Sequence, residues 1–167
     1  MKRDYLTRED VLEIHSEQIE RYGGADGLRD SNQLDSAIAR PQSGYYSDIQ
    51  QEAAALWESL SQNHVFVDGN KRTAFSSTYR FLALNDVTIT ADADEVWEFL
   101  NDAYETGNVR YNVLVDWLSG NTQDFRQEAP QTKKLELDID EIRREAEEHL
   151  QKQSIAQHKG YDHGEDI

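Results

Sequence analysis

The chain has 167 residues, which is enough for one domain with a sizeable core. A hydrophobic content of 37%, with three Trp, eight Tyr and five Phe, indicates a folded protein. The absence of cysteine excludes disulfides and thiolate metal sites. No apolar run approaches membrane-spanning length, and the start MKRDYLTRED has no apolar signal core. We therefore expect a cytoplasmic protein without a membrane association.

The formal net charge is −16, from 33 acidic and 17 basic residues. Nucleic-acid binding depends on neutralising phosphates with Lys and Arg, so we expect no direct nucleic-acid partner. The acidity also makes one local feature prominent, because Lys71 and Arg72 are the only Lys or Arg residues between Pro41 and Tyr79. In so acidic a chain, this pair is the best candidate site for a polyanion such as ATP.

Helical signals begin early in the chain. Residues 7–22 are predicted to form a helix with Thr7 as its N-cap and Asp10 at the capping-box position, ended by Gly23. Within this helix, His15 is expected to be a partly buried residue without a catalytic role. A Gly-rich connection covers 23–30. A short helix capped by Ser31 is expected next, and it stops at Pro41.

A third helix is expected over 49–62, capped by Asp48. Its apolar positions recur with helical periodicity; they are Ile49, Ala53, Leu56, Trp57 and Leu60. The loop 64–69 then leads into a helix over 70–84, which is apolar or small on most sides and should be central. Residues 87–90 are extended but too short to make a sheet alone.

Two further helices complete the predicted domain, one from Asp92 or Asp94 to near Gly107 and one over 109–118. The fold class is therefore all-α: a compact helical domain over 1–120, with at most one small β-hairpin as a flap, plus a helical extension. Residues 121–137 are polar and indicate a linker. Residues 154–167 are expected to be disordered.

The extension helix is predicted over 138–153, with acids in its first turn and Lys152 in its last, as the helix dipole favours. Its apolar positions form a narrow stripe of Ile139, Ile142, Ala146 and Leu150. Such a helix packs on its own domain or on a second copy. The alternative is a docking or regulatory element near the active site.

The stretch HVFVDGNKR, residues 64–72, concentrates the candidate chemistry. His64 offers a proton acceptor and Asp68 a carboxylate, while Gly69 permits a tight turn into the following helix. The helix N-terminus with Lys71 and Arg72 favours a bound anion, most simply a polyphosphate. A carboxylate beside phosphates is typical of Mg²⁺ binding. The loop therefore predicts a phosphoryl- or nucleotidyl-transfer site with a built-in base.

HVFVDGNKR resembles the pattern HxFx(D/N)(A/G)NKR of the Doc branch of the Fic/Doc (Fido) family, the death-on-curing toxins of type II toxin–antitoxin systems. The likeness covers roughly 4–120. It includes GLRDSNQLDSAIARPQ, which is similar to the family's flap region, and the approach AAALWESLSQNH.

This resemblance implies residue roles as well as a fold. His64 would be the general base, and Asp68 would hold Mg²⁺ or orient the acceptor. The anion cradle for ATP would consist of Gly69, Asn70 and Lys71, with Arg72 neutralising charge on the transferred group. Two further residues complete the set of candidates: Phe66 as a structural anchor, and Ser76 as a possible phosphate contact one turn into the helix.

The adenylylating branch of the family instead carries HxFx(D/E)GNGRxxR, with Gly at the position of Lys71 and Arg at that of Phe75. By its likeness to Doc, this chain would bind the nucleotide the other way round, with the γ-phosphate facing His64. That arrangement implies a protein kinase. The alternatives are a protein AMP transferase and a catalytically idle Fido domain that serves as a binding module.

The resemblance also implies partners. The expected target is a hydroxyl group of a translation factor of the elongation factor Tu class, whose phosphorylation arrests translation. The expected regulator is a Phd-like antitoxin whose C-terminal segment folds into the toxin's groove. The inhibitory pattern (S/T)xxxE(G/N) of many Fic proteins has no match here, although the 138–153 helix could mask the groove in another way.

Overall fold

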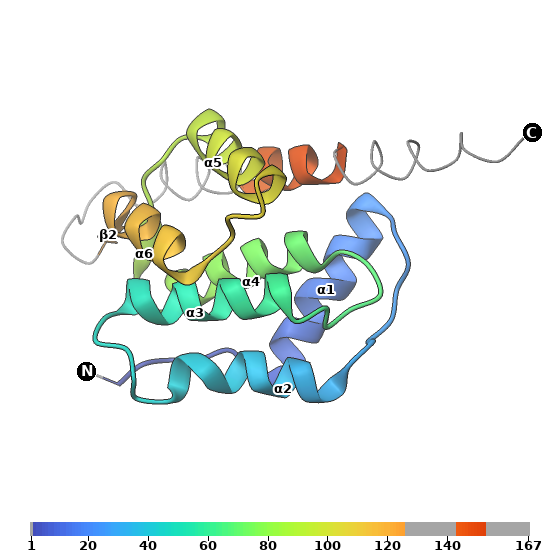
Figure 1. Cartoon of the computed structure of the whole chain (residues 1–167), viewed down its shortest axis with the longest axis horizontal. Helices are drawn as coiled ribbons and strands as arrows, with labels where there is room; N and C mark the ends of the chain where they lie inside the picture. Colours follow the sequence, from blue (N-terminus) through green and yellow to red (C-terminus); the bar gives the residue numbers. More distant parts are fainter. Residues whose placement is uncertain (1, 126–142, 153–167) are drawn as a thin grey trace, which may run out of the picture.

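The computed structural model describes residues 2–125 and 143–152 (Figure 1). The predicted all-α class is confirmed, with one small two-stranded sheet in addition. The elements in chain order are α1 (Arg8–Tyr22), α2 (Ser31–Ala39), the 3₁₀ turn η1 (Arg40–Gln42), α3 (Ile49–Gln62), α4 (Asn70–Leu84), β1 (Val87–Ile89), α5 (Ala93–Glu105), α6 (Tyr111–Gly120) and β2 (Thr122–Asp124). A further helical segment covers 143–152. The predicted tail 154–167 and the apolar positions Ile139 and Ile142 lie outside the described residues.

Side-chain caps define where several helices begin. Thr7 and Asp10 form the predicted capping box of α1, and Asp48 caps α3 by accepting from the Gln51 N–H at 2.8 Å. The predicted cap of α2 was wrong. Asp30, not Ser31, accepts from the Gln33 N–H at 3.1 Å, because its carboxylate reaches the free N–H groups from one residue earlier.

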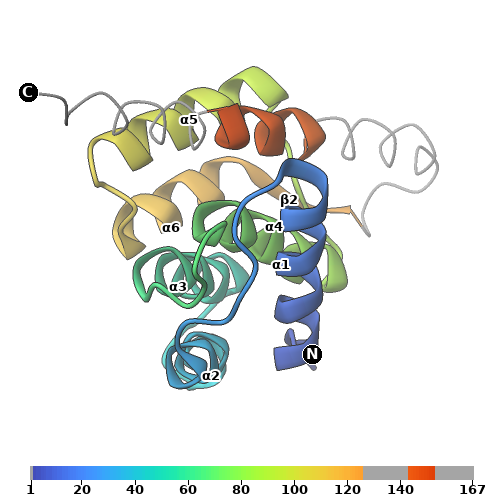
Figure 2. The same ribbon diagram turned by 90° about the vertical axis from the view of Figure 1, so that its right-hand side faces the viewer.

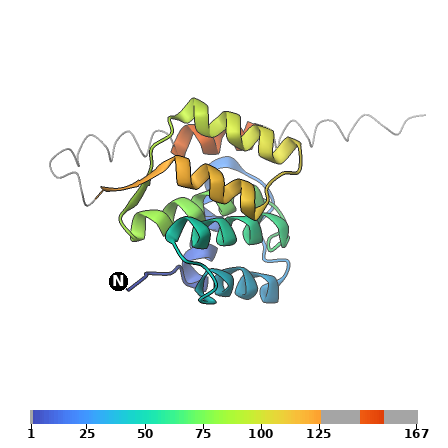
Figure 3. The same ribbon diagram turned by 60° about the vertical axis from the view of Figure 1, so that its left-hand side comes forward.

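Helices α3 and α4 pack against each other at the centre of the molecule, with α1 against α4 and α6 against α3 (Figures 1 and 3). The predicted apolar stripe of α3 is buried throughout. Trp57 lies at the middle of this contact, with Phe75 edge-on at 5.5 Å and Trp117 edge-on at 6.0 Å between ring centroids. This aromatic packing holds α4 rigidly, and with it the loop at its N-terminus.

The helical segment 143–152 packs on its own domain, beside α5 (Figure 2). Its His149 ring stacks on Trp97 of α5 with 4.4 Å between centroids. Ala146 and Leu150 of the predicted apolar stripe are both buried in the core. The segment is therefore an integral part of the helical domain.

The sheet differs from the expected hairpin. β1 pairs antiparallel with β2, Val87 opposite Asp124 and Ile89 opposite Thr122, with α5 and α6 between the strands in sequence. Residues 122–124 were assigned to the linker, because a three-residue strand has no local signal. The expected flap instead makes an isolated antiparallel bridge between Leu28 and Phe66.

Among the described residues, no helix is both long and apolar enough to cross a bilayer.

Candidate active site

The loop 64–69 connects α3 to the N-terminal end of α4, and His64 is its first residue. His64 has a φ of 51°, in the left-handed region that few non-glycine residues adopt. Such conformations cluster at functional sites, where the surrounding structure supports the strain. The imidazole is exposed and has no hydrogen-bond partner within residues 2–125 and 143–152. It is therefore available to take a proton from a bound hydroxyl group.

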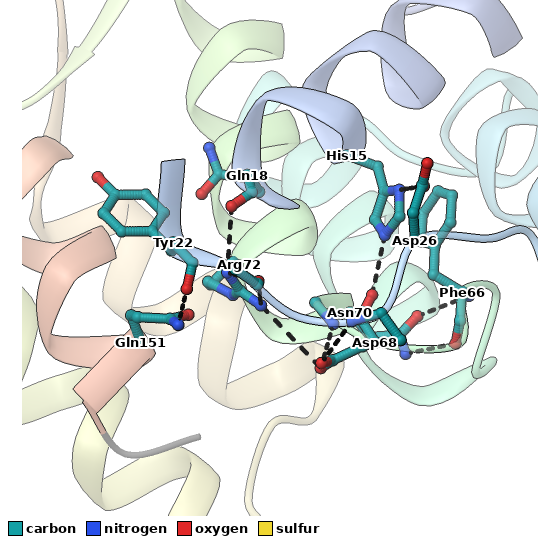
Figure 4. A network of polar contacts seen from close by, with 12 residues as sticks. His15, Gln18, Tyr22, Asp26, Phe66, Asp68, Asn70, Arg72 and Gln151 are labelled. Carbon is teal, nitrogen blue, oxygen red and sulfur yellow. Dashed lines mark hydrogen bonds and ion pairs between the residues drawn. The ribbon is translucent and has the colours of Figure 1, made fainter. Parts of the chain in front are cut away.

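Asn70 closes the loop rather than facing outward. Its Oδ1 accepts from the Phe66 N–H and its Nδ2 donates to the Phe66 carbonyl, both at 2.9 Å (Figure 4). The carboxamide thus satisfies both the N–H and the carbonyl group of Phe66, as the main chain of a neighbouring β-strand would. Phe66 is 1% exposed and packs flat against His15, with 3.8 Å between ring centroids. Both side chains hold the loop in shape.

Gly69 is the N-cap of α4, with a φ of 76°. A Cβ atom there would lie 3.2 Å from Ile19 Cδ1 and 3.4 Å from Arg72 Nη2, a tight fit in a backbone conformation that residues with side chains rarely adopt. No side chain caps α4. The first-turn N–H groups therefore form an anion-binding helix end of the expected kind.

Lys71 lies beside this helix end without a counter-ion. Its Nζ is 5.1 Å from the centre of the Tyr104 ring, in a cation–π contact. Tyr104 is itself held, since its hydroxyl accepts from Trp57 Nε1 at 3.2 Å and shares a hydrogen bond with Ser61 at 3.0 Å. Burial lowers the pKa of Lys71, and it makes no ion pair with any residue that the structure describes. In an acidic protein, such an unpaired cation indicates a site for an anion.

Arg72, the neighbouring cation, is already engaged. It is 1% exposed, and its guanidinium donates to the carbonyls of Gln18 at 3.2 Å and Gly23 at 3.1 Å (Figure 4). Asp68 lies 4.0 Å from its Nη2. Burial lowers the pKa of Arg72 despite this carboxylate. Arg72 therefore clamps the end of α1 to α4, and direct contact with a phosphate would require these hydrogen bonds to open.

Asp68 combines a structural contact with free coordinating capacity. Its Oδ1 accepts from the Gly69 N–H at 2.7 Å and its Oδ2 from the Ala25 N–H at 3.3 Å, while 29% of the side chain stays exposed. No cluster of three or more potential metal ligands occurs in the described part of the chain. A single carboxylate fits Mg²⁺ only when phosphate oxygens and water complete the shell. Asp68 is thus suited to a metal that arrives with a nucleotide.

Ser76 does not face the open site. Its Oγ donates to Oε1 of Glu147, a fully buried carboxylate of the segment 143–152. Glu147 also accepts from the Tyr22 hydroxyl at 3.2 Å and from Arg143 Nε at 2.8 Å. Burial and Glu147 together raise the pKa of Tyr22 to about 12. Ser76 therefore belongs to the contact between α4 and the C-terminal segment.

Sequence reasoning missed three residues around the motif: His15, Tyr104 and Glu147. Tyr104 carries no sequence signal for its contact with Lys71, because the two residues lie on different helices, α5 and α4. Glu147 sits among other acids in EAEEH, where nothing distinguishes the buried residue from the exposed ones. The one available hint was His15, a polar residue on the same face of α1 as the apolar Val11 and Ile19.

The sequence of the chain is similar to those of known proteins. The sequence model of the Fic/DOC family matches residues 5–82, which include the loop and the first turns of α4. The chain is 45% identical over 96 residues to Toxin Doc of Mycolicibacterium smegmatis, covering 54% of this chain and 72% of that toxin. It is 29% identical over 118 residues to Protein kinase doc of Escherichia phage P1, covering 68% and 92% respectively. The chain therefore belongs to the Fic/DOC family.

Proposed function

We propose that this chain is a Doc-type toxin that transfers the γ-phosphate of ATP to a serine or threonine hydroxyl group of a protein. The observation that carries the proposal is Lys71, an unpaired and partly buried cation beside an uncapped helix end. Two similar proteins, one named as a toxin and one as a protein kinase, support the same function.

Several residues of the loop and of the first turn of α4 have a role in this reaction. His64 accepts the proton of the acceptor hydroxyl, while the first-turn N–H groups and Lys71 hold the phosphates. Asp68 contributes the protein's ligand to Mg²⁺. When bound, Mg·ATP supplies the phosphoryl group and a metal that offsets its charge. Arg72 acts indirectly, by keeping the helix end and the connection 23–30 in place.

Two features favour γ-phosphate transfer over AMP transfer. The Lys71 side chain occupies the position at which the adenylylating pattern has glycine, so less room is left beside the helix end. Phe75, at the position of that pattern's second arginine, is buried against Trp57 and offers no charge to an α-phosphate. The nucleotide would then be anchored with its γ-phosphate toward His64.

The target and regulator in this proposal follow from family resemblance. The substrate would be a translation factor of the elongation factor Tu class, and phosphorylating it would arrest translation in the cytoplasm. The partner would be a Phd-like antitoxin that covers the groove at the loop.

The test uses the purified chain, Mg²⁺, elongation factor Tu, and ATP labelled separately at the γ- and α-phosphates. The control variant is His64→Asn, because asparagine tolerates the left-handed backbone at this position. Transfer of γ-label that is lost in the variant supports the proposal, whereas transfer of α-label identifies an AMP transferase. If neither label moves, calorimetry decides: Mg·ATP binding points to a different protein substrate, and no binding points to an idle binding module.

A further inference from the structure

His15 reaches the motif loop from a different helix. It lies in the middle of α1, is 2% exposed, and its Nε2 is 2.9 Å from the carbonyl oxygen of Asp68 (Figure 4). A carbonyl oxygen only accepts hydrogen bonds, so Nε2 carries the proton and donates. The ring also stacks on Phe66 at an interplanar angle of 4°. Both the position and the orientation of the imidazole are therefore determined.

The Asp68–Gly69 peptide group is held on both sides. Its carbonyl accepts from His15 and its N–H donates to the carboxylate of Asp68 at 2.7 Å. Among the described residues, His15 is the one donor to this carbonyl. The same peptide joins the candidate metal ligand to the first residue of the anion-binding helix end. A rotation of this peptide would displace both.

We propose that His15 is a positioning residue of the active site, which holds the Asp68–Gly69 peptide so that the Asp68 carboxylate and the first turn of α4 act on one ligand. The part that concerns Mg²⁺ and nucleotide rests on the proposed function. The part that concerns the loop rests on the His15 contacts alone. Hydrogen bonds that orient a ligating carboxylate act in the same way in metal sites generally.

His15 serves as a fixed donor and not as an acid or base. Three ionisable groups face it: Asp26, whose Oδ1 is 3.7 Å from Nδ1, and Asp68 and Arg72 of the loop and α4. Its Nε2–H is present in the neutral and in the protonated ring alike, so the bond to Asp68 persists in both states. The neutral ring must then carry its proton on Nε2 and leave Nδ1 bare.

The first test compares two variants by calorimetric titration with a non-hydrolysable ATP analogue at several Mg²⁺ concentrations. His15→Phe keeps a ring against Phe66 but loses the donor, whereas His15→Gln can place an amide N–H near the Asp68 carbonyl. We expect His15→Phe to raise the Mg²⁺ concentration needed for binding about 10- to 100-fold, with substantial recovery in His15→Gln. Unchanged Mg²⁺ dependence in folded His15→Phe would overturn the proposal.

The second test does not depend on nucleotide binding. Nitrogen-15 NMR of the wild-type chain should show His15 protonated on Nε2 and bare on Nδ1 above neutral pH. The Gly69 and Asn70 amide resonances should move in His15→Phe and return toward wild type in His15→Gln. A wild-type ring protonated on Nδ1 would refute the positioning role without any variant, and unmoved loop amides in folded His15→Phe would also refute it. If the wild type binds no nucleotide while these signals behave as stated, the proposed function fails and the positioning role stands.

Discussion

The N-terminal end of α4 and the helix turn that contains Ser76 differ in whether their polar and charged side chains have partners. At this end, Lys71 and the loop residue His64 have no charged partner among the described residues, whereas Arg72 is bound to two main-chain carbonyls and lies 4.0 Å from Asp68. One turn later, Ser76 meets Glu147, whose buried carboxylate accepts three hydrogen bonds. Burying a charge costs free energy unless the charge is paired or hydrogen-bonded. The partners of Glu147 meet this requirement, as expected for a structural contact. The unpaired ammonium group of Lys71 marks where a ligand is expected.

The same contrast separates two adjacent residues. Lys71 and Arg72 differ by about 100° around the helix axis, so one faces α5 and the other faces α1. Facing α5, Lys71 finds an aromatic ring; facing α1, Arg72 finds two carbonyl oxygens. We therefore expect Lys71 to act in ligand binding and Arg72 to act in holding the fold.

The largest expected effect is on transfer activity in His64→Asn. Loss of the general base should lower the rate of phosphate transfer about 100-fold or more. Because the imidazole is exposed and unpartnered, the free energy of unfolding should stay within about 0.5 kcal/mol of wild type. Initial rates with labelled ATP and urea denaturation measure the two quantities. A large loss of stability would place His64 with the structural residues and erase the contrast.

The variants Lys71→Met and Arg72→Lys test whether the two neighbouring cations have different roles, one in binding and the other in stability. Lys71→Met should weaken binding of an ATP analogue at least about tenfold, since a charged phosphate contact is lost. It should leave the free energy of unfolding equal or higher, because a desolvated and unpaired ammonium group is removed.

Arg72→Lys should instead lower the free energy of unfolding by about 1–3 kcal/mol, because a lysine cannot serve both the Gln18 and Gly23 carbonyls. Calorimetry and urea denaturation of both variants give the comparison. The reverse pattern, with Lys71 needed for folding and Arg72 only for binding, would contradict the assignment.

Glu147→Gln tests the second turn. The substitution keeps the shape of the side chain but weakens the hydrogen bonds from Ser76, Tyr22 and Arg143, so we expect a loss of about 1 kcal/mol in the free energy of unfolding. Glu148→Gln, an exposed neighbour on the same segment, is the matched control and should be near neutral. Equal effects of the two variants would mean that the Glu147 cluster adds no stability.

The smallest effect concerns pH and His15. Burial lowers the pKa of His15 in the folded chain, so between that value and the unfolded value of about 6.5 the unfolded chain binds more protons. This contribution to stability is fully present above about pH 6.5 and is lost as the pH falls toward the folded pKa. Urea denaturation at several pH values should show a weaker decline below pH 6.5 in His15→Gln than in wild type. Parallel curves would show that His15 titrates alike in both states.

Local signals allowed much of the fold to be predicted. The bounds of α3 and α4 and the capping box of α1 agree with prediction, because caps, periodicity and glycine stops act within a few residues. The strand β2 and the bridge between Leu28 and Phe66 could not be predicted this way. Each forms only when segments distant in sequence pair with each other. A segment of three residues or fewer is also too short to show a recognisable hydrophobic periodicity.

The sequence by itself determined the family pattern, the helical class and the place of the candidate site at residues 64–72. Only the tertiary structure decided how those residues divide their work: His64 and Lys71 open, Asn70 and Arg72 bound to the main chain. It also brought His15 and Tyr104 to the motif, and Glu147 to Ser76 in the next turn of α4, from other helices. The reason is physical. Residue type sets what a side chain can bind, but which partner it meets depends on how the helices cross, and that is a property of the whole packed core.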